Sequence, residues 1–230
     1  MARSYVVGAR GGKGRRKNRA GEVFARLDMK YPDAHIALNF SSEIELLISV
    51  MLSAQTTDVM VNRVTQVLFE KYREPEDYLS VPLEELESDI RSIGTFRQKA
   101  RNLRGSVSIL LEEYDGVVPE TIEEMVRLPG VGRKTANVVA AERGNPQGIV
   151  VDTHVRRLSQ RLDLTRKESP VSIEKDLQIV FPKRDWGKLP HLLISHGRLI
   201  CRARRPRCQE CILVDLCPSS SEEFVLKNTK

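Results

Sequence analysis

The chain has 230 residues, enough for one large domain or two small ones with a full hydrophobic core. Apolar residues make up 40% and charged residues 30%, which indicates a soluble globular protein, and no apolar run approaches the roughly eighteen residues of a membrane helix. Aromatic residues are only 5%, which argues against an RNA-binding sheet that stacks bases. The net charge of +6 favours a polyanionic partner.

Most of this charge lies in residues 1–20, which carry seven basic side chains, four of the fourteen glycines and no acid, whereas the other 210 residues carry 30 Lys+Arg and 31 Asp+Glu. We expect residues 1–20 to form a disordered basic arm that contacts nucleic acid. An organelle transit peptide is the alternative, because such peptides are also rich in Arg and poor in acids. The only apolar cluster here is Tyr5-Val6-Val7, so no secretory signal is expected.

From residue 21 onward helical periodicity dominates and strand-like alternation is nearly absent, so the predicted fold class is all-α. Many short helices joined by Gly/Pro turns do not indicate a simple four-helix bundle. Ser42 with Glu45, and Thr121 with Glu124, form capping boxes, and Asp115-Gly116 stops the longest helix. The predicted helices span residues 43–54, 58–72, 83–93, 96–114, 121–127, 133–143, 153–162, 171–181 and 186–199.

The segment Leu128-Pro129-Gly130-Val131-Gly132 lies between two predicted helices. Gly130 and Gly132 allow a sharp turn, and Val131 can plug between the helices. The next helix then begins with free N–H groups and the positive end of its dipole, which together can bind a DNA phosphate without reading a base, with Arg133 as a further phosphate contact. This pattern is typical of a helix–hairpin–helix motif, although an ordinary turn between helices would show it too.

Lys134 lies in the first turn of that helix, where acids are usually found. A cation is disfavoured near the positive end of a helix dipole, so the position favours a neutral amine. A neutral amine can attack an electrophilic carbon and form a Schiff base. The alternative is that Lys134 only contacts phosphate.

Asp152 is placed to cap the helix predicted for residues 153–162, where the dipole and backbone N–H groups favour its charged form. An ionised carboxylate can stabilise an oxocarbenium-like sugar, as in glycoside chemistry, or it can serve as a cap alone. For His154, two residues on, we expect a structural or phosphate-contacting role.

All the cysteines fall within 17 residues, in the pattern Cys201-x6-Cys208-x2-Cys211-x5-Cys217. In a reducing compartment such clustered thiols indicate a metal more often than disulfides. Four thiolates suit tetrahedral zinc or an iron–sulfur cluster, and the spacing alone does not decide between them. The loop also carries basic side chains and no acid among them, which either form a basic patch or neutralise the thiolates: Arg198, Arg202, Arg204, Arg205 and Arg207.

Four segments together resemble the endonuclease III family of helix–hairpin–helix DNA glycosylases: residues 52–58, 128–139, 151–155 and the four-cysteine loop. The similarity runs in order from about residue 23 to residue 218. It implies a six-helix barrel at 36–147, an iron–sulfur domain made of 21–35 and 148–218, a tail at 219–230, and a DNA-binding cleft between two helical lobes. It also implies a structural [4Fe–4S] cluster on the four cysteines.

The resemblance further implies a bifunctional DNA glycosylase/AP lyase that removes oxidised pyrimidines from double-stranded DNA and also acts on abasic sites. Lys134 would attack C1′ with Asp152 as its electrostatic partner, the strand would be nicked by β-elimination, and Gln55 would fill the gap left by the extruded base. The family often has an apolar wedge after Ile-Gly, where this chain has Thr95 followed by Phe96. A monomer with no membrane association is expected, in the cytoplasm or nucleoid of a bacterium, or in a eukaryotic nucleus or organelle.

A non-catalytic DNA-binding or damage-sensing protein of the same fold is the alternative. The presence of both Lys134 and Asp152 argues against it.

Overall fold

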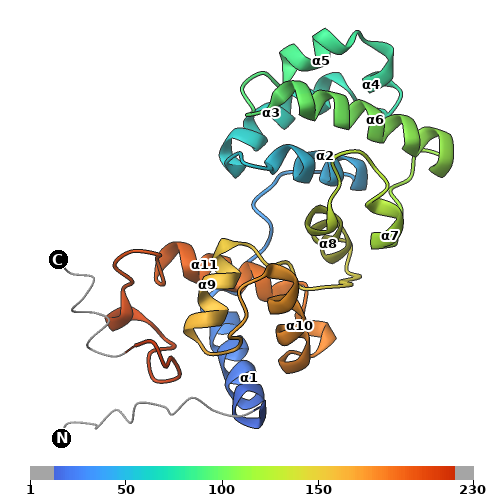
Figure 1. Cartoon of the computed structure of the whole chain (residues 1–230). Helices are drawn as coiled ribbons and strands as arrows, with labels where there is room; N and C mark the ends of the chain where they lie inside the picture. The colour runs from blue at the N-terminus through green and yellow to red at the C-terminus, as the bar shows by residue number, and fades with distance from the viewer. Residues whose placement is uncertain (1–12, 221–230) are drawn as a thin grey trace, which may run out of the picture. The chain divides into compact units, whose positions relative to one another are not determined.

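The computed structural model describes residues 13–220, and every regular element in that range is helical, which confirms the predicted fold class (Figure 1). Two compact units share the chain. One is the continuous segment Ile36–Gln147, and the other combines the residues up to His35 with those from Gly148 onward. The second unit is therefore discontinuous in sequence, and it contains both described ends of the chain.

The unit Ile36–Gln147 is built around α2, whose residues from Leu46 to Leu52 are all buried. Helix α2 contacts α3, α6 and α8. A helix that is apolar on all sides belongs in a core, and this one forms the centre of the unit. Its helices are α2 (Glu43–Ser53), α3 (Asp58–Lys71), α4 (Asp77–Ser80), α5 (Leu83–Asp89), α6 (Phe96–Tyr114), α7 (Ile122–Met125) and α8 (Arg133–Glu142).

Helix ends in this unit follow local signals in the sequence. The Ser42 side chain accepts a hydrogen bond from the Glu45 N–H at the start of α2, as the predicted capping box requires. Helix α6 has the predicted bounds, and it ends where Asp115 and Gly116 both adopt left-handed backbone. The sequence pattern missed α4 and overextended α5, which ends at Asp89.

The other unit packs α1 (Lys13–Lys30), α9 (Thr153–Arg161), α10 (Pro170–Val180) and α11 (Lys188–Leu199) around a second core. Two 3₁₀ turns, Lys183–Asp185 and Cys208–Glu210, complete it. Helix α1 contacts both α10 and α11. The N-terminal segment is therefore part of this core, together with residues more than 100 positions later in the chain.

The prediction of a disordered arm through residue 20 was wrong for its second part, because α1 already begins at Lys13. The physical reason is an apolar stripe, Ala20, Val23 and Leu27, which is fully buried at helical spacing. Arg19 also donates a hydrogen bond to the Leu162 carbonyl at 2.9 Å. Residues 1–12 of the expected arm, and residues 221–230 of the expected tail, lie outside the described part of the chain.

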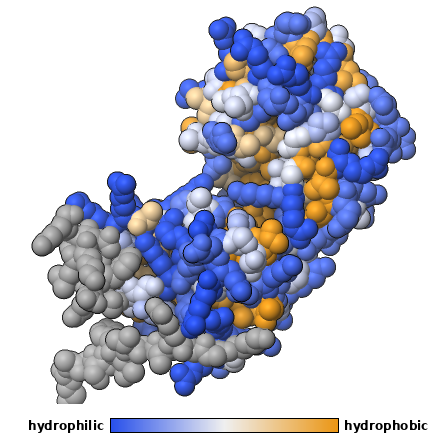
Figure 2. Space-filling view, viewed as in Figure 1, coloured by the Kyte–Doolittle hydropathy of each residue, from blue (hydrophilic) through white to orange (hydrophobic). Residues whose placement is uncertain are grey.

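Across residues 13–220 no helix is long and apolar enough to span a membrane. The face shown in Figure 2 is mostly hydrophilic and carries separate apolar patches. Large exposed apolar side chains, such as Met29, Val59 and Val171, belong to different helices. Scattered exposed apolar residues of this kind are normal on protein surfaces and need no partner to explain them.

Candidate functional site

The predicted hairpin is held tightly against α6. Gly130 has φ +80°, and a Cβ added there would lie 2.6 Å from the Asn102 side-chain nitrogen. The Ser106 hydroxyl donates a hydrogen bond to the Pro129 carbonyl at 2.8 Å, and Val131 is buried, as predicted. Close packing on α6 and a left-handed backbone therefore both require glycine at position 130.

Gly132 was also predicted to allow the sharp turn, but in the structure the turn does not require glycine at this position. Its backbone is extended, at φ −88° and ψ 172°, and a Cβ added there would meet nothing within 4 Å. Gly132 is the N-cap residue of α8 and leaves the first turn of that helix uncovered. Space and free N–H groups at a helix start are the two properties that an anion site needs.

Arg133 and Lys134 are the first two residues of α8, and both are exposed. The first turn of this helix contains no acid. The structure therefore places the predicted nucleophile beside an open helix N-terminus and directly after the hairpin.

Gln55 and Thr95 share an unusual backbone conformation in the same unit. Both are exposed and adopt left-handed φ values of 56° and 57°, although neither is glycine. Non-glycine residues in this region are strained and concentrate at functional sites. Phe96, by contrast, packs against the core and has the Arg97 guanidinium 4.8 Å from its ring centroid. The exposed tip before α6 is therefore Thr95.

Asp152 and His154 belong to the other unit, at the start of α9. Asp152 is the N-cap, and its Oδ1 accepts a hydrogen bond from the Val155 N–H at 2.8 Å, so the predicted cap is present. Arg157 Nη2 lies 3.1 Å from His154 Nδ1. A guanidinium can only donate, so Nδ1 accepts and the neutral ring carries its proton on Nε2. Burial lowers the pKa of His154, which favours this neutral form.

The four cysteines are free thiols that line one pocket in the same unit. Arg161 of α9 reaches them, with Nη1 3.2 Å from Cys201 Sγ and further hydrogen bonds to the Arg202 and Ala203 carbonyls. Arg157, one turn earlier, donates to the Cys201 carbonyl at 3.0 Å. Our prediction considered only arginines of the loop, and it missed these two on a separate helix.

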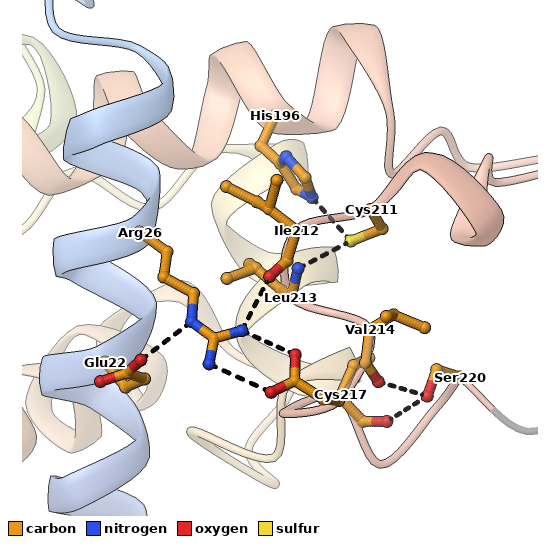
Figure 3. Close-up of polar contacts among 10 residues, drawn as sticks. Glu22, Arg26, His196, Cys211, Ile212, Leu213, Val214, Cys217 and Ser220 are labelled. Carbon is orange, nitrogen blue, oxygen red and sulfur yellow. Dashed lines mark hydrogen bonds and ion pairs between the residues drawn. The ribbon is translucent and has the colours of Figure 1, made fainter. Parts of the chain in front are cut away.

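His196 of α11 also contacts the loop, as Figure 3 shows. It is buried, its Nε2 lies 3.3 Å from Cys211 Sγ, and its Nδ1 lies 3.0 Å from the Tyr31 hydroxyl. Burial lowers the pKa of His196 to about 4. With Cys211 as a thiolate, the neutral imidazole donates from Nε2 to sulfur and accepts from Tyr31. Sequence analysis assigned no role to His196, because its two partners, Cys211 and Tyr31, lie 15 and 165 positions away in the chain.

Burial raises the pKa of the Cys211 thiol to about 12 and that of Cys217 to about 11. Without a cation these thiols stay protonated near neutral pH, so a metal has to displace their protons. Four half-buried thiols around one pocket fit a cluster that takes one thiolate on each of several irons.

Helix α1 also contacts the cysteine loop, through Arg26. Figure 3 shows Arg26 reaching across to the backbone of Ile212. Its two terminal nitrogens also pair with the two carboxylate oxygens of Asp215, at 2.6 and 3.1 Å. A two-point contact of this kind fixes orientation as well as distance.

Comparison with known proteins identifies the family of the chain and its cofactor. Residues 48–183 match the model of the HhH-GPD superfamily of base excision DNA repair proteins. The chain belongs to this superfamily. Residues 201–217 match the iron–sulfur binding domain of endonuclease III, and this range contains the whole cysteine loop.

Named relatives agree with this membership. Endonuclease III of Bacillus subtilis (strain 168) is 51% identical over 188 residues, which cover 81% of this chain and 86% of the relative. Endonuclease III of Escherichia coli (strain K12) is 42% identical over 196 residues, covering 85% and 93%. A solved structure of a trapped covalent intermediate between endonuclease III and DNA superimposes with a TM-score of 0.84 at 46% identity, covering 90% of this chain and 98% of that one.

The predicted resemblance and the two-lobed helical fold are thus confirmed. The chain is a DNA glycosylase/AP lyase of base excision repair, as predicted. Its cofactor is a [4Fe–4S] cluster, which excludes the zinc alternative for the loop.

Proposed function

We propose that this enzyme removes oxidised pyrimidines from double-stranded DNA, with Lys134 as nucleophile, and that it also cleaves at abasic sites. The observation that carries the proposal is the exposed amine of Lys134 in the first turn of α8, directly after a hairpin built for close backbone approach. The solved covalent endonuclease III–DNA intermediate supports it, because such an intermediate requires a protein group that bonds to DNA. A lysine amine can form that bond.

The reaction proceeds in two stages. The Lys134 amine attacks C1′ of the deoxyribose, the bond from C1′ to the base breaks, and the base leaves with a proton. The sugar ring opens, and the nitrogen and C1′ then form a Schiff base. Loss of a proton from C2′ expels the 3′ phosphate, and hydrolysis of the imine releases the enzyme. Asp152 supplies the negative charge that stabilises the positive sugar as the base departs.

The damaged base has to leave the helix, since C1′ is out of reach within a stacked duplex. Gln55 is assigned to the gap left by the base, and Thr95 to the wedge on the opposite strand. The exposed, left-handed positions of both residues support these roles. Thr95 is small and polar, so its wedge is weaker than the apolar residue that the family often has.

The DNA backbone is held by groups that carry no sequence information. The open first turn of α8, with Gly130, Gly132 and Arg133, is assigned to one phosphate. His154 is assigned to another phosphate. The four cysteines are assigned as ligands of the cluster, which contributes folding free energy when it is bound. The enzyme acts as a monomer wherever its DNA lies, in a bacterial nucleoid or in a eukaryotic nucleus or organelle.

Borohydride trapping tests the central step. Wild-type enzyme incubated with a duplex containing thymine glycol is reduced with borohydride, which converts a Schiff base into a stable adduct. We expect Lys134→Gln to bind the duplex but give no adduct. The matched control Arg133→Gln, at the neighbouring exposed position, should bind more weakly and still give adduct at saturating enzyme. Undiminished trapping by Lys134→Gln would place the nucleophile elsewhere.

A further inference from the structure

Lys99 of α6 is a buried lysine for which the chemistry described above has no use. Only 8% of the residue is exposed. Its ammonium lies 2.8 Å from the Leu52 carbonyl oxygen, 2.6 Å from that of Ala54 and 3.1 Å from the Thr56 hydroxyl. An ammonium has three donors, and each of them has one of these neutral oxygens as a partner.

These three partners surround Gln55. Helix α2 ends at Ser53, so the Leu52 and Ala54 carbonyls belong to a helix C-terminus, where backbone acceptors lack helical partners. A cation is favoured at that end of the dipole. Lys99 therefore closes α2 and holds the residues on both sides of Gln55, while the Gln55 side chain itself remains exposed.

Lys99 also reaches the second strained position through its own backbone. Its N–H donates to the Thr95 carbonyl at 3.1 Å, in the first turn of α6. Thr95 makes no side-chain cap on this helix, and its hydroxyl donates to the Gly94 carbonyl. Lys99 thus connects the two segments that contain Gln55 and Thr95, both of which have left-handed backbone.

A left-handed backbone at a non-glycine residue is strained, and it persists only when the surroundings hold it. The Lys99 ammonium supplies such surroundings at the Gln55 turn, and the Lys99 N–H bonds to the Thr95 carbonyl in the first turn of α6. Burial without a carboxylate among the three oxygens at its ammonium also makes the lysine costly to keep, and burial lowers its pKa. A purely structural core position would be filled at lower cost by an apolar side chain.

We propose that Lys99 is a positioning residue for DNA damage recognition, which holds the Gln55 turn and the Thr95 turn in register with each other. This inference rests on the proposed function, because it takes Gln55 and Thr95 as the residues inserted into DNA. The ligand class is duplex DNA that has lost the stacking of one base, such as a duplex with an abasic site. Loss of the ammonium would let the Gln55 turn relax relative to the start of α6 and would weaken the damaged complex specifically.

The test compares Lys99→Met with Arg104→Met. Methionine keeps most of the apolar stem and removes the donors. Arg104 is the matched control, because it lies on the same helix and donates to the Leu79 and Val81 carbonyls at the C-terminal end of α4. Each variant is titrated with a duplex carrying a tetrahydrofuran abasic analogue and with the undamaged duplex of the same sequence.

We expect Lys99→Met to lose about tenfold in affinity for the abasic duplex, the loss expected for a charge-assisted hydrogen bond, and to bind undamaged duplex as wild type does. Arg104→Met should change neither affinity. In the free proteins, amide hydrogen exchange should quicken at residues 54–57 in Lys99→Met and at residues 79–82 in Arg104→Met. An unchanged ratio of the two affinities in a folded Lys99→Met would overturn the proposal.

Thr56→Val is the second variant, and it decides the question if Lys99→Met does not fold. It removes one acceptor of Lys99 and leaves the lysine in place, so a smaller loss, about threefold, is expected with abasic duplex alone. No such loss would also overturn the proposal. Failure of the proposed function looks different: wild-type enzyme would then show no preference for the abasic duplex and no borohydride adduct.

Discussion

Gly130 and Gly132 lie two residues apart in the hairpin, and the structure predicts opposite consequences for replacing them with alanine. At Gly130 an added methyl group takes a left-handed backbone at φ +80° and approaches the Asn102 side chain at 2.6, 2.9 and 3.0 Å. At Gly132 it meets an ordinary backbone and open space. Gly130→Ala should therefore affect folding, and Gly132→Ala should affect DNA binding.

The size of the first effect follows from two contributions. The left-handed backbone costs alanine roughly 1–2 kcal/mol. Moving the Asn102 side chain off its rotamer costs about 1 kcal/mol more and breaks its hydrogen bond from Gln98, which is 2.8 Å long. We expect Gly130→Ala to lower the free energy of unfolding by about 2–3 kcal/mol. Gly132→Ala should cost less than about 1 kcal/mol, because alanine is only a poorer N-cap than glycine.

Urea unfolding followed by circular dichroism measures both free energies, and salt titration of duplex affinity measures the loss of a phosphate contact. Asn102→Ala in the Gly130→Ala background should restore the part of the stability that the clash removes, leaving the backbone cost. Gly132→Ala should bind duplex more weakly and with a shallower salt dependence, by about 0.9 in the slope for one lost phosphate. Equal stability of the two single variants would refute the reasoning, and so would an unchanged salt slope in Gly132→Ala.

Three further predictions concern the other unit. Asp152→Asn should keep the start of α9 intact, since asparagine is an equally good N-cap, but single-turnover excision should slow by at least about a hundredfold; unchanged excision would reduce Asp152 to a cap. Cys208→Ser should lose iron and visible absorbance and unfold more easily, and a colourless wild-type protein containing stoichiometric zinc would contradict the cofactor assignment. Deleting residues 1–20 should lower the unfolding free energy relative to deleting residues 1–12, because Ala20 and Arg19 are packed into the second core; equal stability of the two truncations would show that α1 contributes nothing before residue 21.

The elements that the sequence predicted well are those with strong local signals. Helix α6 could be bounded at both ends because the Asp115-Gly116 stop is local, and α2 could be started at the Ser42 cap. Helix α1 was missed because its basic composition hid the stripe Ala20, Val23 and Leu27, whose partners lie in the second half of the chain. Composition describes a segment alone, whereas burial depends on what packs against it.

The candidate site divides in the same way. Lys134, Asp152 and the cysteines follow from motif spacing, since each motif is contiguous in sequence. Sequence analysis could not find two contacts, that of Arg161 with Cys201 and that of Lys99 with the Ala54 carbonyl. In each pair the residues are separated by about 40 positions and meet only after folding. The exact turn chemistry was also beyond the sequence: both glycines fitted the motif, but only Gly130 is required by its backbone angle.

The discontinuous unit has a consequence for synthesis on the ribosome. Residues 36–147 form a compact unit of their own, so this segment can fold as soon as it has emerged. Helix α1 emerges earlier, but the residues that cover its apolar stripe come after residue 148. Arg26 of this helix can bond to Ile212 and Asp215 only after those residues have been synthesised. Helix α1 therefore completes its packing late in synthesis, at about the time when the cysteine loop becomes available for iron. A chain terminated early, or one made in cells short of iron, would carry a folded middle segment and an amphipathic N-terminal helix with its apolar stripe exposed, which is the kind of surface that chaperones and proteases recognise.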